Sequence, residues 1–390
     1  MGREGRPPFR SCGSRPRLGE ICVTPDWSIK CLVPDLPAPE DILPYLRTMH
    51  DNRWYSNFGP LVNRFERDIA AFLTETDGRP LHAVAVSSAT AALDLMLRAA
   101  DLPEGAHILL PAVTFPATIL TVMNAGYTPV IADVDPVTWD LTPAIATAIT
   151  ASMPIAAVMP VAPFGYGLDI AGWQGFRGDT GLPVFFDAAA VLGQQPVSAD
   201  MPMAFSLHAT KPFGVGEGGL MVTGDADHAA RIRRIANFGF DQGVIVEPGG
   251  NSKMAEYFAG VALAQMDRWP GLLSRRRALY QFYEKTLAGH GLGDMLRRRP
   301  GGVVPATLPL DTRGRARDLM AAFTARGIQH RQWYLPPLHR HPAFADCMRA
   351  AETLPVSDRL NDSLVGVPFH GFLTETDIMT VCDTVRTVCA

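Results

Sequence analysis

The sequence predicts an α/β protein with two domains. The large domain has a mixed, mostly parallel sheet flanked by helices, and the small C-terminal domain is α+β. Three observations lead to this prediction. The chain has 390 residues, and a domain usually contains about 100–200. Short continuous apolar segments alternate with helical patterns up to about residue 240, as in a parallel sheet that is buried on both faces. After a long helical stretch, the chain returns to short strands and helices from about residue 290.

The predicted elements of the large domain begin with two helices. Asp41–His50 is the first, with Asp41 as its N-cap and Pro44 in its first turn, and Asn63–Leu73 is the second. The apolar segments that predict strands are Ala83–Val86, His107–Pro111, Thr128–Asp133, Ala156–Val161, Val184–Asp187, Ala204–Leu207 and Gly219–Thr223. The helices predicted between them are Ala89–Ala100, Phe115–Ala125 and Ile170–Gly175.

The remaining elements connect and complete the two domains. Lys253–Leu287 is predicted as a helical stretch, broken at Pro270, that joins them. Val303–Leu308 predicts a strand, Ala316–Ala325 a helix, and Thr374 begins the last helix. The expected division is a disordered tail over 1–30, the large domain over 31–250, connecting helices over 251–288 and the small domain over 289–390.

Composition and charge argue against several classes of function. The chain has 35 Lys and Arg against 39 Asp and Glu, whereas a nucleic-acid-binding protein usually has a clustered basic excess. Its apolar runs fall short of the ~20 residues that a membrane helix needs. The six cysteines form no C-x-x-C pair and fit no zinc spacing, so we expect a reducing cytoplasm, with neither a metal site nor a disulfide framework.

The first residues differ from the rest of the chain. Arginines at positions 3, 6, 10, 15 and 17 alternate with Gly, Pro and Ser, and no apolar segment follows as in a secretory signal. An organelle transit peptide fits the arginine content. A disordered tail, or translation from an upstream start codon, is the interpretation that we favour.

The most informative stretch, Ala204–Gly219, has the sequence AFSLHATKPFGVGEGG. A strand delivers Ser206, and Lys211 follows in a glycine-rich turn. An unpaired ammonium is costly at the end of a buried strand, so we expect Lys211 either to pair with a carboxylate or to form a Schiff base with a carbonyl cofactor. Ser206 is a candidate ligand for a phosphate, and the glycines allow the backbone to approach a ligand closely.

Three other strand ends carry candidate binding groups. Asp187 ends an apolar strand and needs a cationic or protonated partner, for which a pyridinium nitrogen is one candidate. Ala89 and Thr90 follow Ser88 at the start of a helix, where backbone N–H groups can bind phosphate. Phe115 follows a further strand, where its ring can stack on a flat ligand.

Each of these residues also has a purely structural interpretation. Thr90 alone fits a helix cap, and Phe115 alone fits a core residue. Asp187 alone fits a structural carboxylate, and Lys211 alone fits a surface lysine. Their occurrence together, each at a strand end of one α/β pattern, favours a shared ligand site.

These stretches resemble the DegT/DnrJ/EryC1/StrS family of sugar aminotransferases, which use pyridoxal 5'-phosphate (PLP) on the type I aminotransferase fold. The resemblance runs from about Leu32 to the C-terminus. The motifs that carry it are Trp54–Pro60 with Phe65 and Glu66, Ser88–Leu93, Pro111–Thr118, Asp133–Asp135, Pro160–Gly165, Gly249–Met254 and Gln332–His339.

The resemblance implies a role for each candidate residue. Lys211 would form the internal aldimine with PLP and then move protons, Asp187 would keep the pyridine nitrogen protonated, and Phe115 would stack on the ring. The residues of the same chain that would hold the phosphate are Ser88, Ala89, Thr90 and Ser206. Across the interface of a homodimer with shared active sites, Asn251 of the partner subunit would complete the phosphate site, alone or together with Lys253 of the partner subunit. The residues that would contact the substrate are Tyr334, His339 and Lys253.

Two positions depart from the family's usual residues. Ala190 stands three residues after Asp187, where the family usually has Gln or His, and Ala162 stands where its Pro-Val-His segment has the histidine. Dehydratases of the family replace the Schiff-base lysine by histidine, so Lys211 favours transamination. His208, its neighbour, fits a structural role.

The expected function is a PLP-dependent transfer of an amino group from an amino acid, L-glutamate, to a nucleotide-linked keto-sugar. Ala162 and Ala190 keep two other reactions open, a sugar dehydration and a transamination of a cyclitol or another non-sugar ketone. A regulatory relative that keeps the fold without the activity is the third hypothesis.

Overall fold

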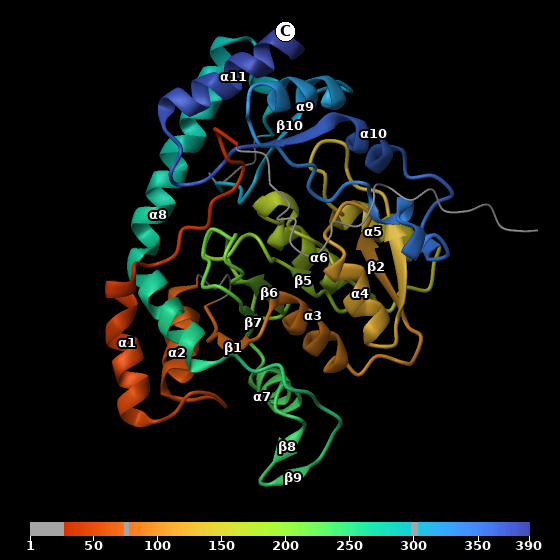
Figure 1. Cartoon of the computed structure of the whole chain (residues 1–390). Coiled ribbons are helices and arrows are strands. Elements are labelled where there is room, and N and C mark those ends of the chain that lie inside the picture. The colour runs from red at the N-terminus through yellow and green to blue at the C-terminus, as the bar shows by residue number, and fades with distance from the viewer. Residues whose placement is uncertain (1–26, 74–77, 298–302) are drawn as a thin grey trace, which may run out of the picture.

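The computed structural model describes residues 27–73, 78–297 and 303–390. Its centre is a mixed sheet (Figure 1). The strands of this sheet are β1 (His82–Val86), β2 (His107–Pro111), β3 (Thr128–Ala132), β4 (Ala157–Val158), β5 (Phe186–Asp187), β6 (Met203–Ser206), β7 (Gly219–Thr223) and β11 (Met348–Arg349). Ladder hydrogen bonds group these strands into two four-stranded sheets, in the orders β1-β7-β6-β5 and β11-β3-β2-β4, which lie edge to edge as the two halves of the central sheet. Parallel pairing of Val158 with Val184 and of Val161 with Asp187 joins the two sheets.

Strand direction determines where the loops of this sheet meet. Strand β7 is antiparallel to both of its neighbours, and the other strand pairs are parallel. The carboxyl ends of the other strands therefore lie at one edge, which is where ligands bind in open α/β sheets. The prediction of an α/β fold with a mostly parallel sheet is confirmed.

Both faces of the sheet are buried. Along β2, Leu109 belongs to one hydrophobic cluster, whereas Ile108 and Leu110 belong to another. This alternation explains why the strands appear in the sequence as continuous apolar runs. The helices that contribute to the first cluster are α1 (Pro39–Asn52), α2 (Pro60–Phe72), α5 (Pro143–Thr150), α6 (Ile170–Thr180) and α8 (Glu256–Gly289). Those that contribute to the second are α3 (Ala89–Arg98), α4 (Ala117–Asn124) and α7 (Ala226–Ile235).

The C-terminal part has its own hydrophobic cluster, which includes Tyr283 and Phe323. Its elements are the antiparallel strands β10 (Leu308–Asp311) and β12 (Leu364–Val367) and the helices α9 (Ala316–Ala325), α10 (Pro355–Ser363) and α11 (Glu375–Cys389). Short 3-10 turns lie at η1 (Pro163–Gly165), η2 (Gly293–Met295), η3 (Leu338–Arg340) and η4 (Pro342–Phe344). Helix α8 runs from α1 and α2 to α11 and so spans both parts (Figure 1).

A protruding hairpin follows α7. It consists of β8 (Phe240–Asp241) and β9 (Val244–Ile245), and it extends away from the body of the protein (Figure 1). Its apolar side chains are exposed, among them Val244 and Ile245 at 61% and 63%. Two arginines of α7 hold its base, since Arg231 and Arg234 both form ion pairs with Glu247.

The start of α2 depends on a buried carboxylate. Both oxygens of Glu256 accept hydrogen bonds from helix N–H groups, of Leu61 and Val62, each at 2.8 Å. A Cβ atom on Gly59 would lie 2.6 Å from the Glu256 carboxyl carbon, so only glycine permits this approach. The N-terminal N–H groups of α2 are thereby satisfied inside the protein.

The structure corrects several predicted elements. Helix α1 begins at Pro39 with Ala38 as its N-cap, so Asp41 is not the cap and Pro44 lies inside the helix. Helix α8 continues through Pro270 instead of breaking there. The part of α8 before Pro270 and the part after it bury side chains in different hydrophobic clusters. This packing offsets the roughly 3 kcal/mol cost of a proline inside a helix.

The predicted strand at Val303–Leu308 is also wrong. The strand is β10, which begins at Leu308, and Pro305 interrupts the segment before it. The N–H groups of Ala306 and Thr307 bond to the carbonyl of Phe164 instead of a neighbouring strand. By contrast, β2, β7 and α9 have the predicted bounds, and Thr374 caps α11 with a capping box.

Most of the predicted tail lies outside the described residues. Its last residues are packed, because Ile29 is buried and pairs with Ile328. Helices long and apolar enough to span a membrane are not found in the described part of the chain. The cysteines that the structure describes, Cys31, Cys347, Cys382 and Cys389, are free thiols.

Candidate functional site

A cavity of about 340 Å³ lies at the edge of the sheet where the carboxyl ends of the strands meet. Eight of the residues predicted from the sequence line it: Ser88, Ala89, Thr90, Phe115, Asp187, Ser206, Lys211 and Tyr334. They come from separate loops and strand ends between residues 88 and 334. The fold therefore brings together the groups that the sequence places far apart.

Asp187 is the buried carboxylate of this cavity, with an exposed fraction of 4%. Its Oδ2 accepts a 2.7 Å hydrogen bond from the hydroxyl of Thr118, and its Oδ1 accepts one from the N–H of Ala189 at 3.2 Å. Burial raises the pKa of Asp187, and the hydroxyl, the N–H and the charge of Lys211 oppose that rise. The carboxylate therefore lacks part of the stabilisation that its charge needs, and a cation or protonated nitrogen in the cavity would supply it.

Lys211 reaches the cavity from the turn after β6. Its N–H donates to the carbonyl of His208 at 2.8 Å, which fixes the turn. Burial lowers the pKa of the Lys211 amine, and the negative charge of Asp187 opposes this effect only in part. A lysine with a lowered pKa is a better nucleophile at neutral pH, because more of it is unprotonated.

The first turn of α3 forms a potential phosphate cradle. Ser88 caps the helix, since its hydroxyl accepts from Ala91 N–H at 3.1 Å, and Ala89 and Thr90 occupy the first helical positions. Gly219 packs against this turn so closely that a Cβ atom there would lie 2.2 Å from the Ser88 carbonyl. Ser88, Ala89 and Thr90 line a cavity that Ser206 also lines, and the N–H groups of a helix N-terminus at such a place suit a phosphate.

Two aromatic residues lie at the walls. The side chain of Phe115 is 61% exposed, so it is not part of the core, and its ring is available to a ligand. Tyr334 packs against Phe164 with ring centroids 5.0 Å apart. Burial, and then the negative charge of Asp187, raise the pKa of Tyr334, so its hydroxyl stays protonated and can donate.

Three predicted site residues do not line the cavity of their own chain. His339 is held outside it, because its Nε2 lies 2.8 Å from Asp358 Oδ1. Asn251 is exposed and pairs with Asn237. The amine of Lys253 lies 4.7 Å from the ring centre of Phe238, also outside the cavity.

The structure adds residues to the site that lie in the quoted motifs but to which the sequence assigns no binding role. Thr114 and Trp333 line the cavity, and Thr118 contacts Asp187 from the first turn of α4. His208 and Glu217 line it as well, with Nε2 and Oε1 3.6 Å apart.

The two departures from the family pattern belong to the same cavity. Ala162 and Ala190 are both among its lining residues. Their methyl groups therefore form apolar wall where the family usually has a polar side chain.

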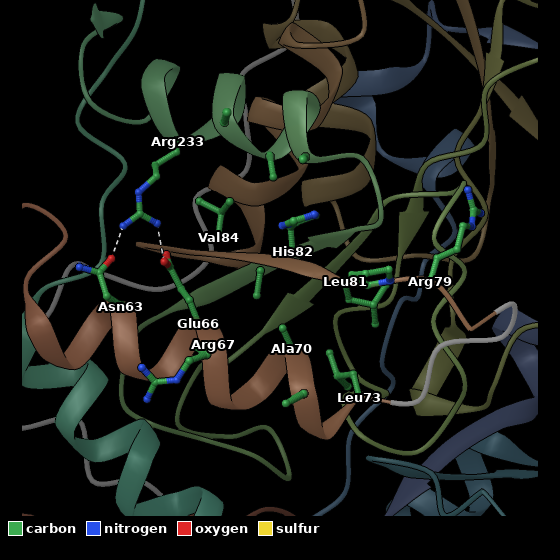
Figure 2. A pocket seen from close by; sticks show the side chains of 16 residues that line it. Asn63, Glu66, Arg67, Ala70, Leu73, Arg79, Leu81, His82, Val84 and Arg233 are labelled. Atoms are coloured by element: carbon green, nitrogen blue, oxygen red, sulfur yellow. Dashed lines mark hydrogen bonds and ion pairs between the residues drawn. The ribbon is translucent and has the colours of Figure 1, made fainter. Parts of the chain in front are cut away.

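A larger cavity, of about 760 Å³, lies between α2, β1 and α7 (Figure 2). Figure 2 shows Arg233 reaching both Asn63 and Glu66. Glu66 in turn accepts from the N–H of Ala85, in β1, at 2.8 Å. These polar groups hold fold elements together, and none of the candidate residues lines this cavity. Size alone therefore does not identify the site.

Solved structures define the class of protein. DesI, crystallised in the presence of its TDP-sugar product, is 31% identical and superimposes with a TM-score of 0.80 over 91% of this chain and 92% of that one. DesV of S. venezuelae, in complex with a ketimine intermediate, is 27% identical, with a TM-score of 0.81 over 89% of this chain and 94% of that one. The fold is that of PLP-dependent aminotransferases.

Sequence comparison places the chain within that class. The model of the DegT/DnrJ/EryC1/StrS aminotransferase family matches residues 38–386, so the chain belongs to this family of PLP-dependent enzymes. A dTDP-3-amino-3,4,6-trideoxy-alpha-D-glucose transaminase of Streptomyces venezuelae is 31% identical, covering 93% of this chain and 95% of the relative. A UDP-2-acetamido-2-deoxy-3-oxo-D-glucuronate aminotransferase of Pseudomonas aeruginosa is 27% identical, covering 83% and 89%. The erythromycin biosynthesis sensory transduction protein EryC1 of Saccharopolyspora erythraea is 30% identical, covering 87% and 93%.

Proposed function

We propose that this aminotransferase moves an amino group from an amino acid, L-glutamate, to a nucleotide-linked keto-sugar. The observation that carries the proposal is the meeting of Lys211, Asp187 and the N-terminus of α3 in one cavity. Two relatives named for dTDP- and UDP-sugar substrates support the class of acceptor. The keto-sugar and the donor would enter the same cavity in turn, as in a ping-pong reaction.

The residues present fit PLP. Asp187 is a buried carboxylate without full charge compensation, the α3 N-terminus and Ser206 offer phosphate donors, and Phe115 offers an exposed ring. When bound, PLP supplies an electron sink for the carbon whose amino group is exchanged. In this arrangement Asp187 would hold the ring nitrogen in its protonated form, and Phe115 would be available to stack on the ring.

Lys211 is the proposed acid–base residue. Burial lowers its pKa from the ordinary value of a lysine, which makes the amine better suited to accept a proton and return it. The same amine is the group that would hold the cofactor covalently between turnovers. Tyr334, which stays protonated, is proposed to donate a hydrogen bond to the substrate from the cavity wall.

We also propose a homodimer in which each subunit completes the other's site. Exposed apolar side chains on the β8–β9 hairpin support such an interface, because a patch of this kind usually marks an interaction surface. Asn251 and Lys253 follow the hairpin and do not line their own cavity, which fits a role for Asn251 of the partner subunit at the phosphate. His339 is not retained as a substrate contact, since Asp358 holds it.

Two further predictions from the sequence remain proposals. The division into residues 31–250 and 289–390 is supported by the separate hydrophobic cluster of the C-terminal part. The cytoplasm as the place of action rests on the cysteine pattern alone.

The first test is borohydride reduction of the PLP-loaded protein followed by peptide mass analysis. Reduced cofactor is expected on Lys211, and cofactor on another lysine or on none would refute the assignment. Incubation with L-glutamate should then release 2-oxoglutarate and leave pyridoxamine phosphate. A panel of nucleotide-linked keto-sugars identifies the acceptor.

The second test addresses the shared site. Lys211→Ala and Asn251→Ala variants are each expected to be inactive, and a mixture refolded together should regain activity, because one site of each mixed dimer carries neither change. A mixture as inactive as its components would refute the shared site.

A different reaction of the same cavity is the alternative function. Ala162 and Ala190 give the wall apolar surface where the family usually has polar groups, which favours a sugar dehydration or a transamination of a cyclitol or other non-sugar ketone. Failure to form pyridoxamine phosphate with glutamate would favour the dehydration. A regulatory role is the third candidate, because the relative EryC1 is named a sensory transduction protein. A purified protein whose yellow colour depends on Lys211 and that catalyses transamination would exclude a purely regulatory role.

A further inference from the structure

The two oxygens of the Asp187 carboxylate are held from two sides. The hydroxyl of Thr118, in the first turn of α4, lies 2.7 Å from Oδ2, and the N–H of Ala189 lies 3.2 Å from Oδ1. Thr118 is fully buried, with an exposed fraction of 0%. A second hydroxyl, that of Thr114, lies 2.7 Å from the hydroxyl of Thr118. The three side chains therefore form a continuous chain of hydrogen bonds that ends on Asp187.

The direction of these bonds follows from their chemistry. An ionised carboxylate has no proton to give, so Thr118 must donate to Asp187. A hydroxyl has one proton, and that of Thr118 is then committed, so Thr114 must donate to Thr118. Each bond polarises the next, which strengthens the bond to the carboxylate.

This arrangement addresses a specific electrostatic difficulty. Burial raises the pKa of Asp187, yet the proposed function requires a carboxylate that is charged when the ring nitrogen arrives. Among the described residues, the titratable groups that interact with Asp187 are Lys211 and Tyr334. Lys211 is committed to chemistry and Tyr334 is neutral, so the permanent stabilisation comes from the Thr118 hydroxyl and the Ala189 N–H.

We propose that Thr118, supported by Thr114, is a positioning residue that keeps Asp187 ionised and fixes the plane of its carboxylate toward the cofactor ring. The inference rests on the proposed role of Asp187. It assigns Thr118 a role in cofactor binding although Thr118 itself does not line the cavity. Helix α4 thereby acts on the cofactor through the carboxylate and without touching it.

The test is the pH dependence of PLP binding to the apoprotein, followed by absorbance. Thr118→Val removes the hydroxyl and keeps the shape, and Thr118→Ser keeps the hydroxyl. Thr121→Val is the matched control, because Thr121 is equally buried on the same helix and its hydroxyl bonds to the carbonyl of Thr118 and not to Asp187. Thermal unfolding of each apoprotein shows whether it is folded.

Thr118→Val is expected to weaken PLP binding roughly tenfold or more at neutral pH, which is what loss of a hydrogen bond to a charged group produces. The acid limb of the binding profile should move up by about one pH unit, since Asp187 then takes up its proton more easily. Thr118→Ser should restore the wild-type profile, and Thr121→Val should leave it unchanged.

Three results would overturn the inference: an unmoved acid limb in Thr118→Val, an equal loss at every pH, or the same shift in Thr121→Val. If Thr118→Val does not fold, Thr114→Val is measured in its place. The acid limb of its PLP-binding profile should then move up by less than in Thr118→Val, and an acid limb that does not move would contradict the inference. Failure of the proposed function would look different, because the wild-type protein itself would not bind PLP in a way that depends on Lys211.

Discussion

Replacing Gly219 by alanine is expected to weaken PLP binding by displacing the N-terminus of α3. A Cβ atom on Gly219 would lie 2.2 Å from the carbonyl carbon and oxygen of Ser88 and 2.5 Å from the nitrogen of Ala89. An ordinary contact between such atoms is about 3.5 Å, so the turn has to move by roughly 1 Å. These are backbone atoms, and no side-chain rotation can relieve the clash.

The size of the effect follows from hydrogen-bond geometry. The N–H groups of this turn are the proposed phosphate donors, and a donor that moves by roughly 1 Å leaves the range of about 2.7–3.2 Å of a hydrogen bond. A hydrogen bond to a charged group contributes about 1.5–3 kcal/mol. Loss of one such bond raises the Kd for PLP roughly 10- to 150-fold.

The assay is titration of the apoprotein with PLP, with Gly224→Ala as the control. Gly224 lies just beyond the other end of β7, and a Cβ atom there would come within 2.3 Å of the Ala199 Cβ. The crowding is similar, but the phosphate turn is not involved. We expect both variants to be destabilised and only Gly219→Ala to lose affinity. Wild-type affinity in Gly219→Ala, or an equal loss in both, would refute the reasoning.

Four further predictions concern other residues of the site and the fold. The chain has four lysines, and in the apoprotein Lys211 should react with an acylating reagent at lower pH than its ordinary value implies, because burial lowers its pKa. Asp187→Asn should lower the midpoint of the pH–rate profile for acylation of Lys211 further, because the charge of Asp187 opposes the lowering of the Lys211 pKa. A rise of that midpoint would contradict this prediction. Glu256→Leu should reduce the free energy of unfolding in urea by about 2–4 kcal/mol, because the N–H groups of Leu61 and Val62 lose their acceptors, and Glu256→Gln should lose less. Phe115→Ala should change the free energy of unfolding by less than about 0.5 kcal/mol, because the ring is exposed, but it should speed PLP dissociation severalfold. Leu120→Ala is the control, since Leu120 lies in the adjoining helix α4 and is 41% exposed.

The sequence predicts the position of a candidate residue well where that residue ends a strand or follows one. Asp187 and Ser206 end apolar strands, and Lys211 follows one, so their place at one edge of the sheet follows from the strand order. Residues whose position depends on tertiary contacts are different. Thr118 looks like an ordinary residue of a helix start, and only the contact with a strand 69 residues away gives it a role. The motif around His339 assigns that residue to the site, but Asp358, which holds it, is not part of the motif.

Element boundaries show the same limit. Pro270 predicts a break when read locally, but packing on both sides holds α8 continuous. Val303–Leu308 has the apolar character of a strand, yet Pro305 and the bonds of Ala306 and Thr307 to Phe164 direct the chain elsewhere. Local patterns thus locate most elements, and long-range hydrogen bonds decide where they begin and end.

The sequence leaves open whether Lys211 pairs with a carboxylate or reacts with a carbonyl cofactor. A structural ion pair would stabilise both charges, yet burial lowers the pKa of Lys211 and raises that of Asp187, so each group is pushed toward its neutral form. The ion pairs found among the described residues do not include one between these two. Titratable groups whose pKa values burial shifts in one shared cavity are typical of a functional site, which favours the proposed cofactor role over a purely structural pair. PLP would offer a ring nitrogen to Asp187 and a carbonyl to Lys211, so the proposed cofactor role accounts for both residues, whereas their mutual attraction offsets the effect of burial on each pKa only in part.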